Sequence, residues 1–271
     1  VLGESALDAS VSGGNNTAIG KNALTALTSG QNNIAIGKGC GEDMTSGQNN
    51  TLVGSDTGRD ITSGLRNTYL GFSAGFSHTT ADDNVGIGSN VLEQNTTGTQ
   101  NTAVGAFALD ANTTASQNTA VGYNSLTANT TGANNTAVGQ ISLRANTTGD
   151  DNTAVGRGAL ANATTASDNT ALGSSALAEN TTGTNNVAVG HQALDANTTG
   201  GSNTCIGRNS LGANTTGGAN FAGGTSALES NTTASNNTGI GYFALLSNTT
   251  GTRNTAVGAL ALDANTTADF N

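Results

Sequence analysis

The sequence predicts an all-β protein, a parallel β-solenoid, and three observations support this prediction. Asn recurs every 17 residues from Asn16 to Asn271, without an insertion or a deletion. Gly follows each Asn by four residues, from Gly20 to Gly258, and the segment between them is rich in Thr, Val and Ile. A fixed period is typical of proteins that stack one small structural unit on the next. We therefore expect about sixteen coils of 17 residues.

The composition disfavours an ordinary globular domain. The 271 residues include 39 Gly, no Pro and no Trp, and only 3% are aromatic. Aromatic side chains normally supply much of a globular core, so a compact body of this length would lack core material. Low charge with much Gly, Asn and Thr is also found in disordered chains. The unbroken register favours an ordered repeat fold over a disordered chain.

The consensus of one repeat is Asn-Thr-Ala-Val-Gly-x-x-Ala-Leu-x-x-Asn-Thr-Thr-Gly-x-x, and we number its positions 1 to 17 from the first Asn. This unit is too short for two helices and a turn. Its Thr, Val and Ile segments bounded by Gly and Asn favour short strand, turn, short strand, turn. Stacked coils of this kind form parallel sheets in which each strand is paired above and below.

Two apolar columns are expected inside the coil. The main column is Leu at position 9, as in Leu24, Leu92, Leu109 and onward to Leu262. The second is Val or Ile at position 4, as in Ile19, Val104, Val121 and Ile240. Small residues at position 8 indicate a tight inner corner.

Three coils break the Leu column, and the replacements are informative. Leu is replaced by Gly at Gly41, Gly58 and Gly75. The same coils carry Met44, Ile61 and His78 three positions later, where most other coils have Asn. This exchange predicts that positions 9 and 12 reach the same interior.

Two further columns have predicted structural roles. The Asn side chains of position 1 are expected to form a ladder in which each amide bonds its equivalent one coil away, as in cross-β structures. Representative ladder residues are Asn101, Asn118, Asn135, Asn152 and Asn169. The Gly of position 5 is expected at a corner with positive φ, where a Cβ would be penalised. Representative corner residues are Gly105, Gly122, Gly139, Gly156 and Gly173.

We interpret residues 1–271 as a single solenoid array, with variable coils in 1–90 and regular coils in 91–271. The chain begins and ends within a repeat, and solenoids need capping units, so we expect the polypeptide to continue at both ends. Apolar residues occur on both faces of the strand segment, as Ile34 and Val187 show beside Leu52 and Tyr69. Because strands with two apolar faces are buried on both sides, we expect a homo-oligomer, either a trimer or a fibre.

The motif Asn-Thr-Ala-Val-Gly-x-x-Ala, as in 101–108 and 254–261, resembles the head repeats of trimeric autotransporter adhesins. It is also similar to repeats of phage-type tail-fibre proteins. The resemblance covers the whole chain, although the adhesin units are shorter and lack the Asn-Thr-Thr segment. It implies a trimeric, left-handed parallel β-roll at a cell surface or on a virion appendage. It brings no catalytic residues.

The sequence contains little that suggests chemistry. His78 and His191 lie far apart at different repeat positions, and Cys40 and Cys205 replace small residues about ten coils apart, beyond the reach of a disulfide. The acids of position 10 (Asp110, Asp195, Glu229, Asp263) are interrupted by other residues, so no calcium stripe is expected. We therefore expect no enzyme activity, catalytic residue, cofactor or metal. The net charge of −10 argues against nucleic acid as a partner, and the lack of long apolar runs argues against membrane insertion.

Our leading interpretation is a structural shaft of an extracellular adhesin or tail fibre, which holds a distal binding tip away from its base. Any receptor or glycan would then be bound through regions outside this chain. The alternatives are a self-assembled extracellular filament and an ice-binding β-solenoid that uses the paired Thr columns. The filament could be glycan-coated, because Asn-Thr-Thr is an N-glycosylation sequon. Candidate acceptors are Asn95, Asn112, Asn129, Asn146, Asn180 and Asn197, with the same triplet at Asn214, Asn231, Asn248 and Asn265. The competing reading of these Asn is an internal ladder.

Overall fold

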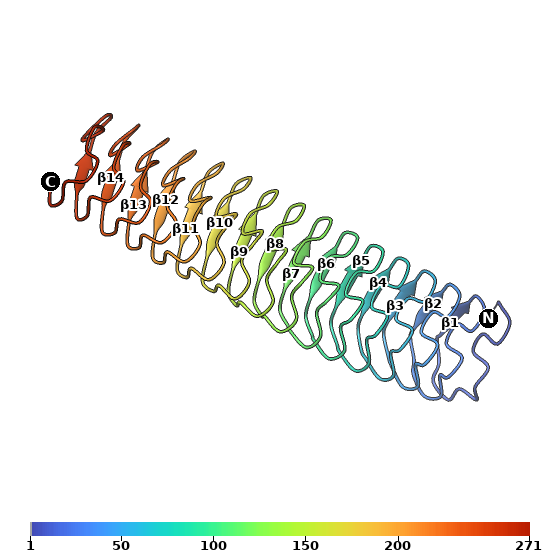
Figure 1. The fold of residues 1–271 in the computed structure, drawn as a ribbon. Helices are drawn as coiled ribbons and strands as arrows, with labels where there is room; N and C mark the ends of the chain where they lie inside the picture. Colours follow the sequence, from blue (N-terminus) through green and yellow to red (C-terminus); the bar gives the residue numbers. More distant parts are fainter. Residues whose placement is uncertain (1) are drawn as a thin grey trace. The chain divides into compact units, whose positions relative to one another are not determined.

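The computed structural model describes residues 2–271, which form two compact units, 2–134 and 135–271. Each coil carries one three-residue strand (Figure 1). The first unit contains β1 (Thr17–Ile19), β2 (Ile34–Ile36), β3 (Thr51–Val53), β4 (Thr68–Leu70), β5 (Val85–Ile87), β6 (Thr102–Val104) and β7 (Thr119–Val121). The second contains β8 (Thr136–Val138), β9 (Thr153–Val155), β10 (Thr170–Leu172), β11 (Val187–Val189), β12 (Thr204–Ile206), β13 (Phe221–Gly223), β14 (Thr238–Ile240) and β15 (Thr255–Val257).

Within each unit, every strand pairs in parallel with the strand of the next coil. The register is a constant shift of 17 residues, so that Thr17 pairs with Ile34 in the first unit and Thr153 with Thr170 in the second. The same register holds along β1–β7 and along β8–β15. The predicted all-β parallel solenoid with a 17-residue period is therefore confirmed.

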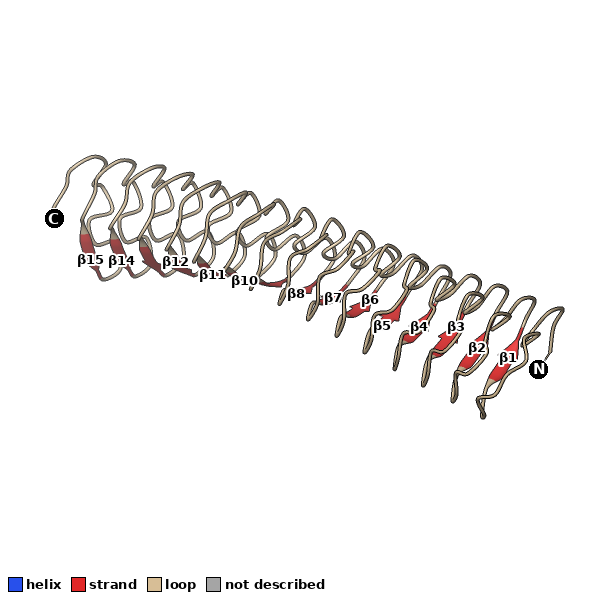
Figure 2. Ribbon diagram, turned by 90° about the horizontal axis from the view of Figure 1, so that it is seen from below, coloured by secondary structure: helices blue, strands red, loops and turns tan. Residues whose placement is uncertain are grey.

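The expected second strand of each coil is absent from the described residues. Positions 6 to 11 are turns, and Figure 2 shows each coil as one short strand followed by loop. The reason is local conformation: positions 7 and 9 have left-handed φ, as at Phe107 (58°) and Leu109 (52°), which is outside the β region. The segment still bonds its neighbours, since Phe107 N–H donates to the Ser89 carbonyl at 3.0 Å and Leu109 N–H to the Ser125 carbonyl at 3.2 Å.

The left-handed conformation of position 9 explains why the Leu column is interrupted by Gly. Gly41, Gly58 and Gly75 have φ values of 60°, 56° and 60°, close to the 52° of Leu24. Gly adopts this conformation without steric cost, whereas β-branched residues are strongly disfavoured there. The backbone thus restricts which residue replaces Leu.

The predicted Leu column is confirmed, and the predicted Val and Ile column is wrong. Leu24, Leu92 and Leu109 are completely buried, whereas Leu262, in the last coil, is 39% exposed. Ile19 and Ile240, by contrast, are 37% and 41% exposed. Successive side chains of a strand point to opposite faces, so position 3 lies inside while positions 2 and 4 both lie outside. The second buried column is therefore the Ala of position 3, whose members include Ala18, Ala103, Ala120, Ala137, Ala154 and Ala188.

The predicted exchange between positions 9 and 12 is confirmed. Met44, Ile61 and His78 are fully buried in the coils that lack the Leu. A Cβ added to Gly58 would lie 2.7 Å from Ile61 Cδ1 and 3.0 Å from Leu52 Cδ2. The larger side chains at positions 12 and 3 therefore occupy the space that Leu leaves.

Tyr69, a large buried residue at position 3, needs room from two glycines. A Cβ on Gly75, in the same coil, would lie 2.6 Å from Tyr69 Cε2. A Cβ on Gly86, at position 3 of the next coil, would lie 2.7 Å from Tyr69 Cδ1. The variable coils are thus a packed alternative to the regular core, in which large residues are matched by Gly.

The Gly corners are confirmed. The five representatives Gly105, Gly122, Gly139, Gly156 and Gly173 have φ between 130° and 142°. Stacking adds a second requirement, because a Cβ on Gly156 would lie 2.5 Å from the carbonyl oxygen of Gly173 in the next coil. Conformation and close backbone approach together exclude any side chain at this column.

We predict that Gly156→Ala lowers the free energy of unfolding by at least about 3 kcal/mol, because the variant combines backbone strain with a steric overlap. Gly212→Ala is the matched control, since Gly212 lacks positive φ and its Cβ would lie no closer than 3.3 Å to other atoms. Denaturant titration of both variants measures the difference. Equal stability of the two variants would contradict the assigned role of the corner.

Candidate structural ladders and interaction surface

The Asn side chains of position 1 form a continuous buried ladder within each unit. In the second unit, Asn203 shows the pattern: its Nδ2 donates to Asn186 Oδ1 at 3.2 Å and to the Gly217 carbonyl at 2.9 Å. Its Oδ1 accepts from both N–H and Nδ2 of Asn220, at 3.0 and 3.1 Å. Each amide thus satisfies both its donors and its acceptor inside a dry core.

The predicted ladder residues have these partners. Asn101 Nδ2 donates to Asn84 Oδ1 at 3.1 Å, and Asn118 N–H donates to Asn101 Oδ1 at 3.0 Å. Asn152 and Asn169 donate through Nδ2 to Asn135 Oδ1 and Asn152 Oδ1, at 3.1 and 3.2 Å. All of these side chains are completely buried. The ladder is therefore a real feature of both units.

A second buried Asn ladder runs along position 12, where it replaces the apolar residues of the first coils. Asn112 Nδ2 donates to Asn95 Oδ1 at 2.9 Å, and Asn197 Nδ2 donates to Asn180 Oδ1 at 2.8 Å. Each Nδ2 also donates to the carbonyl three residues later, as Asn112 does to Ala115 at 3.0 Å. The ladder is interrupted at Ala163, which is buried at the same position.

This packing is incompatible with glycans on the Asn-Thr-Thr triplets. The six candidates Asn95, Asn112, Asn129, Asn146, Asn180 and Asn197 are all completely buried. A glycan would be attached to Nδ2, the atom that donates the hydrogen bonds described above. The internal-ladder reading of these residues is the one that agrees with the structure.

We predict that Asn203→Ala lowers the free energy of unfolding by about 3 kcal/mol or more. The substitution leaves the N–H and Nδ2 of Asn220 without the Asn203 Oδ1 acceptor inside the core, and orphaned buried donors cost about 1–3 kcal/mol each.

Thr199→Ala, at an exposed site four residues earlier, is the matched control. It should change stability by no more than about 0.5 kcal/mol. Denaturant unfolding followed by circular dichroism measures both. A ladder variant as stable as the control would show that the ladder contributes little.

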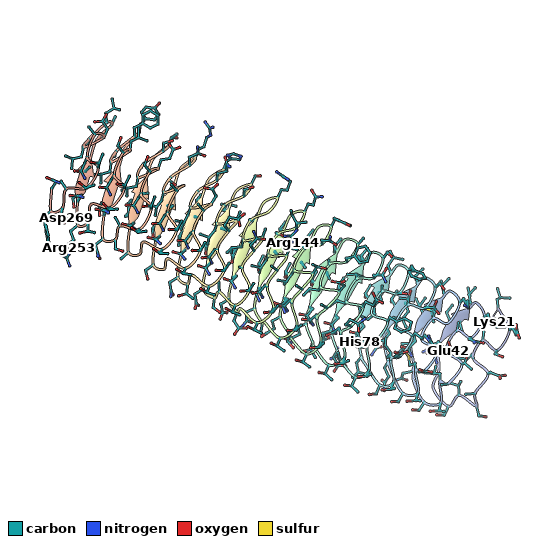
Figure 3. All side chains as sticks on the ribbon, in the orientation of Figure 1. Lys21, Glu42, His78, Arg144, Arg253 and Asp269 are labelled. Carbon is teal, nitrogen blue, oxygen red and sulfur yellow. The ribbon has the colours of Figure 1, made fainter. Side chains whose placement is uncertain are left out.

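His78 marks the change from an apolar position 12 to the Asn ladder. Its Nε2 lies 2.6 Å from the Ala81 carbonyl, so Nε2 carries the proton and Nδ1 is an acceptor. Tyr69 Oη lies 2.9 Å from Nδ1, and Asn95 Nδ2 approaches it to 3.5 Å. The imidazole thus connects the packed apolar coils to the first ladder Asn. Figure 3 labels His78 among the coils of the first unit.

Burial lowers the pKa of His78 to about 4, while the nearby Asp82 carboxylate opposes this shift. Burial also raises the pKa of Tyr69 above its ordinary range, so Tyr69 stays a neutral donor. A histidine with a lowered pKa stabilises the fold fully above pH 6.5. That stability is lost as the pH falls from 6.5 toward 4, because the unfolded chain binds the proton first.

We predict that this histidine alone removes about 3 kcal/mol of stability between pH 7 and pH 4. His78→Asn should abolish that part of the pH dependence, because Asn does not titrate and is the usual residue at position 12. The free energy of unfolding of both proteins, measured across this range, gives the difference. Parallel pH profiles would show that His78 is not the titrating group.

The cysteines and the second histidine behave as the sequence indicates. Cys40 and Cys205 are free and buried. Burial raises the pKa of Cys40 to about 12, and burial also raises that of Cys205, so neither thiol ionises near neutral pH. His191 is exposed. Within residues 2–271, no group of three or more His, Cys, Asp or Glu side chains could hold a metal ion.

One small hollow lies in the second unit, with a volume of about 250 Å³. Its lining residues are Gln192, Asp195, Asn209, Gly212, Ala213 and Glu229. Gly212 creates it, since this position 10 lacks the side chain that Asp195 and Glu229 have in the flanking coils. Asn209 Oδ1 is buried there without a hydrogen-bond partner among the described residues. The polar lining suits ordered water.

The outer face of the strands is the most distinctive surface of the molecule. It consists of positions 2 and 4 of β1–β15, and none of these positions holds a charged residue. In the first unit its exposed apolar members are Ile19, Ile34, Ile36, Leu70 and Ile87. In the second they are Leu172, Ile206, Phe221, Ile240 and Val257. An uncharged face with recurring exposed apolar residues is a candidate interaction surface.

The paired Thr columns are less available than the sequence suggested. The hydroxyls of most Thr at position 13 donate to the Thr carbonyl of the next coil, as Thr198 Oγ1 does to Thr215 at 3.0 Å. The Thr of position 14 are exposed, whereas most Thr of position 13 are half-buried, with Thr28, Thr45 and Thr266 as exposed exceptions. This engagement weakens the ice-binding alternative, which needs both columns free.

The comparisons with known proteins add no relationship: no family model matches the chain, and no curated protein matches it. No helix among residues 2–271 has the length and apolar character needed to cross a membrane.

Proposed function

We propose that this chain is a structural shaft segment of an extracellular fibre, of the adhesin or tail-fibre type, that assembles through the outer face of its strands. The observation that carries the proposal is the absence of charge on that face in a chain of net charge −10. Acidic side chains lie at other positions of the coil, including Glu42, labelled in Figure 3. Charge is thus present at other positions of the coil and absent from the outer face of the strands.

A second copy of the same chain is the occupant that fits this face best. Its columns repeat with the same 17-residue register and the same strand spacing, so contacts made by one coil recur in the next. An uncharged face also lets two acidic chains approach without bringing like charges together. Three chains around one axis would bury the face in each copy, and we propose this trimer as the assembled state.

A mechanical role agrees with the core. Hydrogen bonds between coils run through the strands, through the turns and through both Asn ladders. No coil among the described residues departs from the 17-residue register, and the hollow at Gly212 is lined by ordinary repeat positions. Such a segment resists bending and spans distance, and binding would be located elsewhere in the fibre.

We predict that the chain is a trimer in solution and that Leu172→Glu with Ile206→Glu makes it monomeric. Both side chains are 48% exposed on the outer face of the second unit, and paired copies would bury the new carboxylates without partners. Sedimentation equilibrium gives the mass of each protein.

The control is Thr182→Glu with Thr216→Glu, which adds the same charge to exposed residues of the same two coils. It should remain trimeric, and all variants should retain the β spectrum of the parent. A monomeric parent protein would overturn the trimer. Polymers without a defined mass would favour the filament instead.

A further inference from the structure

A second set of glycosylation sequons exists in the chain, and it lies on the outside. The triplet Asn-Asn-Thr begins at position 17 in four coils, at Asn15, Asn49, Asn134 and Asn236. These triplets are distinct from the Asn-Thr-Thr triplets of position 12. Each one arises where three columns meet: a corner Asn, a ladder Asn and the first Thr of a strand.

All four acceptor side chains are exposed. Each residue has left-handed φ, with values of 63°, 59°, 59° and 62° in chain order. Asn tolerates this conformation better than most residues, and it places the side chain on the corner before the strand. The next residue is held in the buried ladder, so the corner is fixed relative to the coil.

The amide nitrogens of these corners are accessible. Nδ2 of Asn49 and of Asn236 donates to no group among the described residues, and Asn49 Oδ1 accepts only from the exposed Asn32 at 3.3 Å. Asn15 Nδ2 donates to Asn32 Oδ1 at 3.1 Å, also on the surface. By contrast, Asn112 Nδ2 donates two hydrogen bonds inside the core.

We propose that Asn15, Asn49, Asn134 and Asn236 are the N-glycan acceptor sites of this chain. In the transfer, Asn Nδ2 forms a bond to the anomeric carbon of a diphosphate-activated sugar. The bond from that carbon to the phosphate oxygen breaks, the diphosphate leaves with the electron pair, and Nδ2 loses one proton. The sugar donor and a sequon-specific transferase are supplied by the cell that produces the chain. The inference extends the proposed extracellular role, but it depends only on which amides the folded chain exposes.

A fifth sequon, Asn162-Ala163-Thr164, is not included. Its Asn162 is half-buried, and its Nδ2 donates to Glu179 Oε2 at 2.9 Å while its Oδ1 accepts from Arg144 at 3.3 Å. This amide is therefore held by two charged neighbours.

The test is to incubate the purified, folded chain with a soluble N-glycosyltransferase that adds one hexose from a nucleotide-activated donor to Asn-x-Thr. Intact mass and peptide mapping then locate the hexoses. A synthetic peptide of residues 109–119, which contains the Asn112 triplet without the fold, shows that the enzyme accepts that triplet.

We expect hexose at Asn15, Asn49, Asn134 and Asn236 and none at Asn95, Asn112 or the other completely buried position-12 triplets, while the peptide is modified. Asn49→Gln and Asn236→Gln should each remove one hexose and leave the β spectrum unchanged. Modification of the buried triplets in the folded chain, or unmodified corners beside a modified peptide, would overturn the proposal. The sedimentation mass of the same material reports separately on the trimer, so either proposal can fail alone.

Discussion

The hydrogen bonding of each position-1 Asn to its equivalent one coil away is the interaction on which the rest of the structure depends. Asn203 uses its amide to join the coil before it, the coil after it and the corner of its own coil. Because the bond geometry allows no slip, the ladder fixes the register of the whole coil. Once the Asn residues are aligned, the strand, the Gly corner and the Leu of each coil are aligned with their equivalents in the next coil. A few short side chains thus replace the large apolar core that the composition lacks.

The architecture could be predicted from sequence because the period is a global signal that needs no knowledge of contacts. The ladder at Asn101 and the exchange of Leu for Met44 or Ile61 were also readable, since both are patterns along columns. The side of the strand on which Val104 lies was not. Ala103 and Val104 are both apolar, and only the pleat tells which of them points inward. Here the small Ala faces the interior and the larger Val faces outward, although the larger apolar residue is usually expected inside. This reversal follows from the narrowness of the coil.

The missing second strand has a similar cause. The sequence around Leu109 contains apolar residues at strand-like spacing, but the structure alternates left-handed residues there. Leu has no intrinsic preference for that conformation, so a Leu in the sequence does not predict a left-handed backbone. Gly41, Gly58 and Gly75 were the sequence signal for this left-handed backbone, because Gly is the residue that replaces Leu when positive φ is required. The Asn-Asn-Thr triplets are also visible in the sequence, but only the structure shows that they are exposed while the Asn-Thr-Thr triplets are buried.

The constant 17-residue register has a consequence for how such a chain can change in evolution. Every coil meets its neighbours through the same atoms, so removing or duplicating one whole repeat joins surfaces that already match. A change of any other size would place non-equivalent positions against each other where the altered coil meets its neighbours. Unequal recombination between near-identical repeats produces the permitted changes directly. The number of repeats can therefore change between related chains while the cross-section of the coil stays the same. The number of coils can thus evolve independently of the fold of each coil.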